Sequence, residues 1–133
     1  GRLFINDSKA TTVGAVMMAL ESLPDGVTLI LGGRTKGDDY SRLARSMRGR
    51  VKNLILIGES APAFEKLFAG FNIARAESLD DAVVEAMRKS LPGDTVLLSP
   101  ACASFDMFTS YEERGERFVE SYLKLVRGEL EWI

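Results

Sequence analysis

The run Val27-Thr28-Leu29-Ile30-Leu31, followed at once by Gly32-Gly33, decides the fold of this chain. The run carries no charge and ends at a glycine pair, which is typical of a strand that is buried on both faces and stops at a turn. A glycine-punctuated loop, Gly32 to Asp39, and a helical pattern from about Tyr40 to Met47 come next. Strand, loop and helix in this order indicate one unit of a parallel α/β sheet.

The same alternation continues in both directions along the chain. The further predicted strands are Leu3–Ile5, Val51–Ile57, a short edge strand Asn72–Ala74 and Thr95–Leu98. The further predicted helices are Lys9–Ser22, Ala61–Phe68 with Pro62 in its first turn, Leu79–Ser90 and Tyr111–Val126. We therefore expect one α/β, Rossmann-like three-layer domain over residues 1–133, with a mainly parallel sheet of five or six strands and helices on both faces.

Composition excludes several classes of protein. The formal net charge of the 133 residues is -2, so the chain has no basic excess that would favour a nucleic-acid partner. We expect no membrane partner either, because no apolar run approaches the roughly twenty residues that cross a bilayer and the N-terminus lacks a signal-peptide layout. The single cysteine, Cys102, cannot form an intrachain disulfide, which favours a reducing cytoplasm. The absence of histidine excludes a nucleophile paired with histidine and most zinc sites.

Two loops that follow predicted strands carry the polar residues of a candidate site. One is Asn6-Asp7-Ser8-Lys9-Ala10-Thr11, and the other is Ser99-Pro100-Ala101-Cys102-Ala103-Ser104-Phe105-Asp106. Ligands bind at the carboxyl edge of a parallel sheet, so we expect both loops to line one crevice. Lys9 lies beside a predicted helix start capped by Asp7 or Ser8, where free N–H groups favour phosphate or carboxylate; an ordinary cap with a solvated lysine is the alternative.

The remaining loop residues have a functional and a structural interpretation each. Lys36 either supplies one charge to a ligand or is a solvated loop lysine, and Ser104 either donates to a carboxylate or caps a turn. The loop that contains Lys36 matches neither the dinucleotide fingerprint nor the P-loop, so a triphosphate must be held elsewhere. Without a histidine, Cys102 is expected to be a small buried packing residue.

The last predicted helix and the segment before it indicate packing and a solvated surface. Core or lid packing is the expectation for Phe105, Met107, Phe108 and Tyr111. A solvated charged face is predicted from Glu112, Glu113, Arg114, Glu116, Arg117, Glu120 and Lys124.

Taken together, the motifs resemble those of the C-terminal domain of the Mur ligase family, and among its members those that add D-glutamate. The resemblance rests on NDSKAT at 6–11, LGG at 31–33 with Lys36-Gly37, LLSPACASFD at 97–106 and Glu113-Arg114-Gly115. It implies a three-domain, cytoplasmic, monomeric ligase of peptidoglycan synthesis. The N-terminal domain of such an enzyme binds UDP, and the central domain carries the P-loop and holds most of the ATP and Mg²⁺.

The chemistry implied by the resemblance is formation of an amide bond. ATP phosphorylates the carboxylate of UDP-N-acetylmuramoyl-L-alanine, and the amine of D-glutamate attacks the acyl phosphate. The present domain would bind and orient D-glutamate and part of the nucleotide, with no metal of its own, and would be inactive when isolated.

Four positions correspond to partners of D-glutamate in this resemblance. Lys36 and Thr11 match residues that contact its α-carboxylate, while Ser104 and the backbone N–H of Tyr111 match those that contact its side-chain carboxylate. Phe105, next to Ser104, belongs to the same predicted substrate-binding set.

Two further positions correspond to contacts with the nucleotide. Lys9 matches a residue near the transferring phosphate and is the predicted catalytic residue, and Asp7 matches one that contacts the ribose. Two departures from the family stand out: Thr12 replaces a frequent asparagine, with no assigned consequence, and Tyr111 replaces a frequent phenylalanine.

Three other classes of protein are alternatives. A non-enzymatic receiver-type module would need an aspartate after the third strand and a lysine after the fifth, where this chain has Gly58-Glu59 and Ser99-Pro100. A nucleotide-binding module of oxidoreductase type would need glycines after the first strand. A folylpolyglutamate synthetase-like ligase domain also adds glutamate, and the resemblance of residues 99–106 argues against it.

Overall fold

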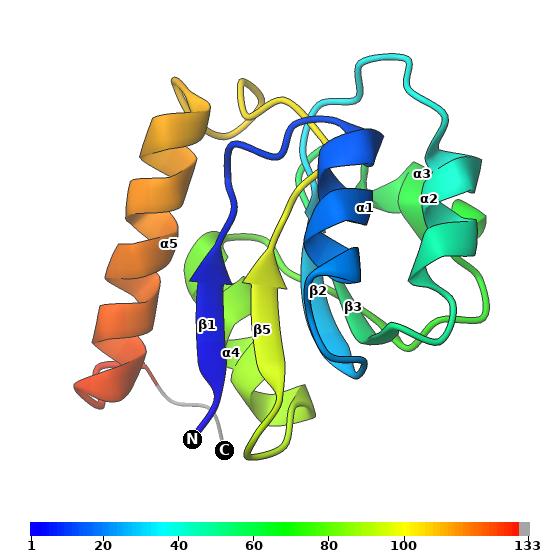
Figure 1. The fold of residues 1–133 in the computed structure, drawn as a ribbon. Coiled ribbons are helices and arrows are strands. Elements are labelled where there is room, and N and C mark those ends of the chain that lie inside the picture. The colour runs from blue at the N-terminus through cyan, green and yellow to red at the C-terminus, as the bar shows by residue number, and fades with distance from the viewer. Residues whose placement is uncertain (131–133) are drawn as a thin grey trace.

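The computed structural model describes residues 1–130, so the last three positions of the expected domain 1–133 lie outside the described residues. Within them, five strands form one sheet in the order β1-β5-β2-β3-β4, and every neighbouring pair is parallel (Figure 1). The strands are β1 Leu3–Asn6, β2 Val27–Gly32, β3 Val51–Ile57, β4 Ile73–Arg75 and β5 Thr95–Leu98. The helices are α1 Val13–Glu21, α2 Tyr40–Met47, α3 Ala61–Leu67, α4 Leu79–Lys89 and α5 Tyr111–Val126.

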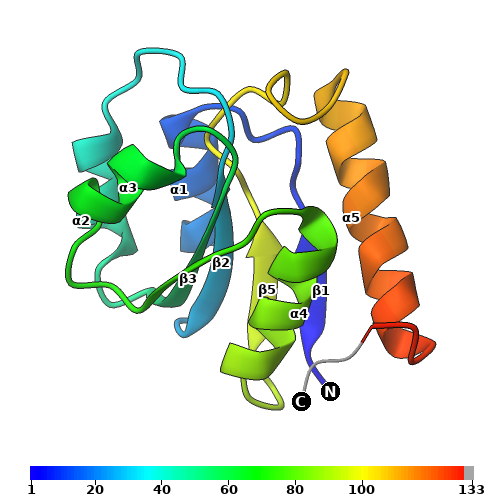
Figure 2. The same ribbon diagram turned by 180° about the vertical axis from the view of Figure 1, so that it is seen from behind.

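Helices cover both faces of the sheet, which confirms the predicted three layers (Figures 1 and 2). On one face, α1, α2 and α3 bury Leu29 and Leu31 of β2. On the other face, α4 and α5 bury Ile30 of the same strand. Since successive side chains of a strand point to opposite faces, a strand between two helical layers must be apolar throughout, and all of β2 is buried.

The strand order brings three loops to one edge. Because β5 pairs with both β1 and β2, its last residue Leu98 lies opposite Asn6 of β1 and opposite Ile30 of β2. The segments that follow these strands therefore gather at the carboxyl edge, together with the start of α5, at the top of Figure 1. This is the arrangement expected for the two motif-bearing loops, and it adds the loop after β2.

The start of α1 differs from the prediction. The helix begins at Val13 rather than Lys9, and its N-cap is Thr12, whose hydroxyl accepts the N–H of Ala15 at 3.2 Å. The predicted caps, Asp7 and Ser8, lie in the preceding loop. That loop is held by bonds to other parts of the fold, so residues 7–11 do not continue the helix.

The other elements agree closely with their predicted bounds. Pro62 lies in the first turn of α3 as expected, and the edge strand β4 is displaced by one residue from the predicted range. None of the helices in residues 1–130 is long and apolar enough to cross a bilayer.

Candidate substrate-binding site

Backbone hydrogen bonds join the loops after β1, β2 and β5 into one unit. The Asp7 N–H donates to Leu98 O at 2.8 Å, and the Ala101 N–H donates to Ala10 O at 2.9 Å. Arg34 and Ala103 each donate an N–H to the other's carbonyl at 2.9 Å, forming an isolated antiparallel bridge. The loop after β5 is therefore fixed between the other two.

The glycine pair after β2 makes this close approach possible. Gly32 and Gly33 have φ values of +127° and +141°. A Cβ on Gly33 would lie 2.4 Å from Ala103 O, and one on Gly32 would lie 2.1 Å from Ile57 O. Both positions therefore require glycine, for conformation and for space.

Lys36 and Thr11 meet at the rim of the three loops. The Lys36 ammonium donates to the Thr11 hydroxyl at 3.1 Å, although the two residues are 25 positions apart. The backbone N–H of Lys36 also donates to the Tyr40 hydroxyl at 3.3 Å, which connects this loop to the start of α2. One ammonium and one hydroxyl are thus presented together at an exposed place, as recognition of a carboxylate requires.

Ser104 and Tyr111 offer two further donors. Ser104 is 2% exposed, and its carbonyl accepts the N–H groups of Met107 and Phe108 in a tight turn. Its hydroxyl makes no hydrogen bond within residues 1–130. Tyr111 is the first residue of α5, and its N–H has no partner there either, as is usual in the first turn of a helix.

Of the two expected roles, core or lid packing, the core role is excluded for two aromatic residues. Phe105 is 63% exposed, and Tyr111 is also exposed. Met107 and Phe108 do pack partly against the core formed by α4 and α5. Phe105, next to the buried Ser104, is therefore available to cover a ligand.

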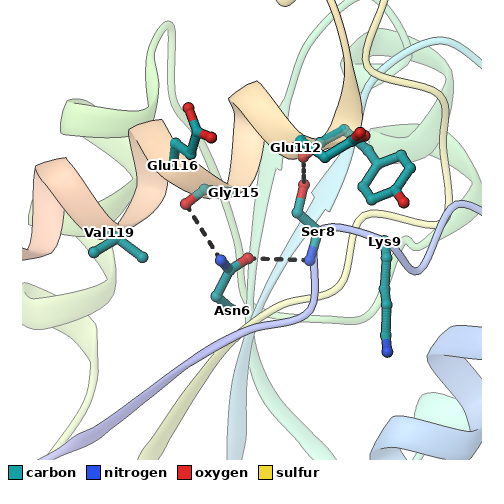
Figure 3. A pocket seen from close by; sticks show the side chains of 8 residues that line it. Asn6, Ser8, Lys9, Glu112, Gly115, Glu116 and Val119 are labelled. Atoms are coloured by element: carbon teal, nitrogen blue, oxygen red, sulfur yellow. Dashed lines mark hydrogen bonds between the residues drawn. The ribbon is translucent and has the colours of Figure 1, made fainter.

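Asp7 and Lys9 border a groove between β1 and α1. The groove has a volume of about 740 Å³ and includes apolar walls from Ile5, Met18 and Leu97. One carboxylate oxygen of Asp7 accepts the Ser99 hydroxyl at 3.0 Å. Lys9 is exposed and extends away from the contact between Asn6 and α5 (Figure 3).

Arg114 corrects the prediction of a solvated charged face. It is 1% exposed and lies on the buried stripe of α5 with Phe118 and Ser121. Its Nε donates to Ser8 Oγ at 2.9 Å, one terminal nitrogen to Ser8 O at 2.7 Å, and the other to Cys102 O at 3.0 Å. Burial lowers its pKa to about 10, so the side chain remains cationic at neutral pH. Its helical spacing of four to Phe118 was the signal in the sequence that could have shown its burial.

Ser8 and Asn6 connect the loop after β1 to the start of α5 (Figure 3). The Ser8 hydroxyl donates to Tyr111 O at 2.6 Å, and the Asn6 amide donates to Gly115 O at 3.3 Å. These contacts line a hollow of about 500 Å³ beside α5. The sequence did not single out Ser8 for this role, because a serine near a helix start is read first as a cap.

Cys102 is a packing residue, as predicted. It is fully buried, and burial raises the pKa of its thiol to about 11, so it is protonated at neutral pH. No group of three or more histidine, cysteine, aspartate or glutamate side chains is arranged to hold a metal in the part of the chain that the structure describes.

Comparison with known proteins shows the family of the chain. The sequence model of the family described as "Mur ligase, glutamate ligase domain" matches residues 1–102. The protein named UDP-N-acetylmuramoylalanine--D-glutamate ligase in Salinibacter ruber is 50% identical over 118 residues, which are 87% of this chain and 26% of the relative. Proteins of the same name from Hahella chejuensis and Geotalea daltonii are 50% and 46% identical, covering 89% and 97% of this chain but 28% and 29% of their own length.

The chain thus spans a little over a quarter of the length of these relatives. The matched residues include the glycine pair, the loop after β1, all five strands of the sheet and the first part of the loop after β5. The chain lacks the sequence features of a receiver or of a dinucleotide-binding module. The chain belongs to the Mur ligase family, as its C-terminal, glutamate ligase domain.

Proposed function

We propose that this chain is the part of an ATP-dependent ligase that binds and orients D-glutamate for addition to UDP-N-acetylmuramoyl-L-alanine in cytoplasmic peptidoglycan synthesis. The observation that carries the proposal is the contact between Lys36 Nζ and Thr11 Oγ1, on loops that are bonded to the loop of Ser104. The names of the relatives, which contain D-glutamate ligase, support the choice of amino acid.

D-Glutamate has two carboxylates, and the site has two sets of donors. We assign the Lys36 ammonium and the Thr11 hydroxyl to the α-carboxylate. The Ser104 hydroxyl and the Tyr111 N–H take the side-chain carboxylate, and the start of a sixteen-residue helix favours a negative charge at that point. The exposed Phe105 ring excludes water from the bound amino acid.

The contribution of these residues to the reaction is mainly positioning. Amide formation requires the amine of D-glutamate to approach an activated acyl carbon along one direction, and holding reactants in that geometry lowers the barrier by several kcal/mol. Lys9 lies at the rim of the groove beside α1 and supplies a positive charge near the phosphate that leaves.

The residues beside α1 fit part of a nucleotide. The Asp7 oxygen that is not bonded to Ser99 can accept a ribose hydroxyl, and the apolar wall of the groove suits the nucleoside. ATP would supply the phosphoryl group that activates the alanine carboxylate. We assign Mg²⁺ and the triphosphate mainly to the central domain, since the described residues include neither a P-loop nor a cluster of metal ligands.

The N-terminal and central domains of the same monomeric enzyme complete the site in this proposal. The relatives are three to four times as long as this chain, which leaves room for both domains. Closure of the present domain on the central one would bring D-glutamate to the acyl phosphate.

The test is phosphate release by the full-length parent enzyme with UDP-N-acetylmuramoyl-L-alanine, ATP and a panel of D-amino acids. Turnover should depend on D-glutamate. Lys36→Ala and Ser104→Ala should each raise the KM for D-glutamate by about 10- to 100-fold, since a hydrogen bond to a charged group contributes about 1.5–3 kcal/mol. Lys66→Ala, an exposed lysine on α3, is the matched control and should leave the KM unchanged.

Two results would contradict the proposal at different levels. Turnover that does not depend on D-glutamate would overturn the function. Unchanged KM values in both folded variants would retain the function and overturn the assignment of the carboxylate donors.

A further inference from the structure

Arg114 is a buried cation that forms no ion pair within residues 1–130, and the Asp106 carboxylate acts on it electrostatically without bonding to it. Its three hydrogen bonds go to one hydroxyl and two carbonyl oxygens, all of them neutral. Burial of a charge without an ion pair is costly, as the lowered pKa of its guanidinium indicates. A leucine or methionine at this point of the buried stripe would avoid that cost, so the arginine is expected to serve something other than packing.

The three bonds of Arg114 join the start of α5 to two of the three loops of the proposed site, those after β1 and β5. Ser8 lies between Asp7 and Lys9 on the loop after β1, and Cys102 lies two residues before Ser104 on the loop after β5. Arg114 itself lies in the first turn of α5, which begins at Tyr111. The Ser8 hydroxyl extends the chain of bonds, because it accepts from Arg114 and donates to Tyr111 O at 2.6 Å.

The shape of the guanidinium suits this task. It is planar and presents N–H groups in several fixed directions, whereas a lysine ammonium cannot satisfy three acceptors that are spread around a fork. One terminal nitrogen of Arg114 lies next to Gly33, at an ordinary van der Waals distance of 3.5 Å from the place of a Cβ on that residue.

We propose that Arg114 is a positioning residue that fixes Ser104 and the Tyr111 N–H relative to Lys9, and thereby sets recognition of the side-chain carboxylate of D-glutamate. This inference rests on the proposed function. Arg114 is buried under the loops and touches the loops rather than the ligand.

The experiment measures KM and kcat for D-glutamate and for UDP-N-acetylmuramoyl-L-alanine in the full-length parent enzyme. The variants are Arg114→Lys, Arg114→Met and Ser8→Ala. The matched control is Arg117→Met on the same helix, because Arg117 is exposed and contacts only Glu120 among the ion pairs, at 3.8 Å. The control should keep both KM values within about twofold of the wild type.

We expect Arg114→Met to raise the KM for D-glutamate by about 10- to 100-fold and to lower kcat, with the KM for the UDP substrate within about twofold of the wild type. Arg114→Lys keeps the charge but not the forked shape of the guanidinium. Its rise in the KM for D-glutamate, on a logarithmic scale, should be more than half of the rise in Arg114→Met. Ser8→Ala removes only the hydroxyl between Arg114 and Tyr111 and should raise the KM for D-glutamate by about 3- to 10-fold.

A purely structural role would give a different pattern. The active fraction would fall while both KM values stayed at the wild-type level, and that result would overturn the inference. Full recovery by Arg114→Lys would also overturn it, because charge alone would then suffice.

If both Arg114 variants fail to fold, Ser8→Ala decides, and an unchanged KM for D-glutamate contradicts the inference. Failure of the proposed function is distinct, since the wild type itself would then show no turnover dependent on D-glutamate.

Discussion

Tyr40 shows how one residue holds two loops in register. Its hydroxyl accepts the Lys36 N–H at 3.3 Å and donates to Ala101 O at 3.4 Å, and its ring packs on Phe64 with centroids 4.9 Å apart. The side chain is 9% exposed, and burial is the main cause that raises its pKa to about 12. The phenol is therefore protonated wherever the domain is folded at ordinary pH.

The raised pKa of Tyr40 predicts a loss of stability at alkaline pH. The unfolded chain releases this proton near pH 10 and the folded chain near pH 12, so ionisation favours unfolding as pH rises through that interval. The contribution is complete below pH 10, and at pH 11 it should be smaller by about 1 kcal/mol.

Urea unfolding of the wild type and of Tyr40→Phe at pH 9, 10 and 11 measures this effect. Cys102 contributes a loss of the same sign, because its pKa is raised as well, and its thiol is bonded to the Tyr40 hydroxyl. The same pair of proteins is therefore also compared with Cys102→Ala in both. The wild type should lose more free energy of unfolding than Tyr40→Phe between pH 9 and 11. Parallel pH profiles for the two proteins would show that Tyr40 is not the source.

At the scale of elements, the start of α1 gives Thr12 a defined role. Its hydroxyl caps the helix by accepting the Ala15 N–H, and the Val13 N–H is bonded to Asp38 Oδ2 at 2.8 Å. Asparagine, the residue that the resemblance gives as frequent at this position, is also a good N-cap residue, so we expect either residue to cap the helix.

Removing this cap should destabilise the domain modestly. Thr12→Ala is expected to lower the free energy of unfolding by about 1 kcal/mol, whereas Thr12→Asn should stay within about 0.5 kcal/mol of the wild type. Urea unfolding of the three proteins checks this. Equal losses in the alanine and asparagine variants would mean that the hydroxyl does not act as a cap.

The turn after β2 allows a sharper comparison between two glycines of the same loop. A Cβ on Gly33 would overlap Ala103 O, whereas one on Gly37, with φ of +75°, would meet nothing within 4 Å. Gly33→Ala should therefore lower the free energy of unfolding by about 3 kcal/mol or more, and Gly37→Ala by about 1–2 kcal/mol from backbone strain alone. Equal losses in the two variants, measured by urea unfolding, would contradict the close approach at Gly33.

At the scale of the whole molecule, stability and activity reside in different places. The described residues form a hydrophobic core on each face of the sheet, so the chain has what an independent folding unit needs. Its proposed ligands, by contrast, are held at an open edge formed by three loops and the start of one helix.

We expect this chain, expressed by itself, to unfold cooperatively in urea but to release no phosphate from ATP, with or without D-glutamate. Binding of D-glutamate should be weak, because closure on the central domain completes the site in our proposal. Phosphate release and isothermal titration calorimetry measure the two expectations. Robust ATP hydrolysis by the isolated chain would contradict the assignment of the triphosphate to the central domain.

The sequence by itself determined the sheet and most of its helices, because their signals are local. A run such as Val27–Leu31 has an apolar residue wherever a strand buried on both faces needs one, and four predicted elements agree with the observed bounds at both ends: Tyr40–Met47, Val51–Ile57, Thr95–Leu98 and Tyr111–Val126. Resemblance then led to Lys36, Thr11, Ser104 and Tyr111. The order of strands and loops predicted a shared edge for Thr11 and Ser104, whereas the place of Lys36 and Tyr111 at that edge came from the structure.

The tertiary structure alone decided how the loops are held. Arg114 reads as one charge among many on α5. Its spacing of four to Phe118 is compatible with burial, but its bonds to Ser8 and Cys102 follow from the packing of α5 beside β1. The sequence predicts a helix from Lys9 with Asp7 or Ser8 as its cap, but bonds to Leu98, Ala101 and Arg114 occupy backbone groups of residues 7–10, so α1 begins at Val13. Local propensity was outweighed at both places because all but one of these hydrogen bonds join residues about ninety or more positions apart in the chain; the exception is Arg114 to Cys102, 12 positions apart.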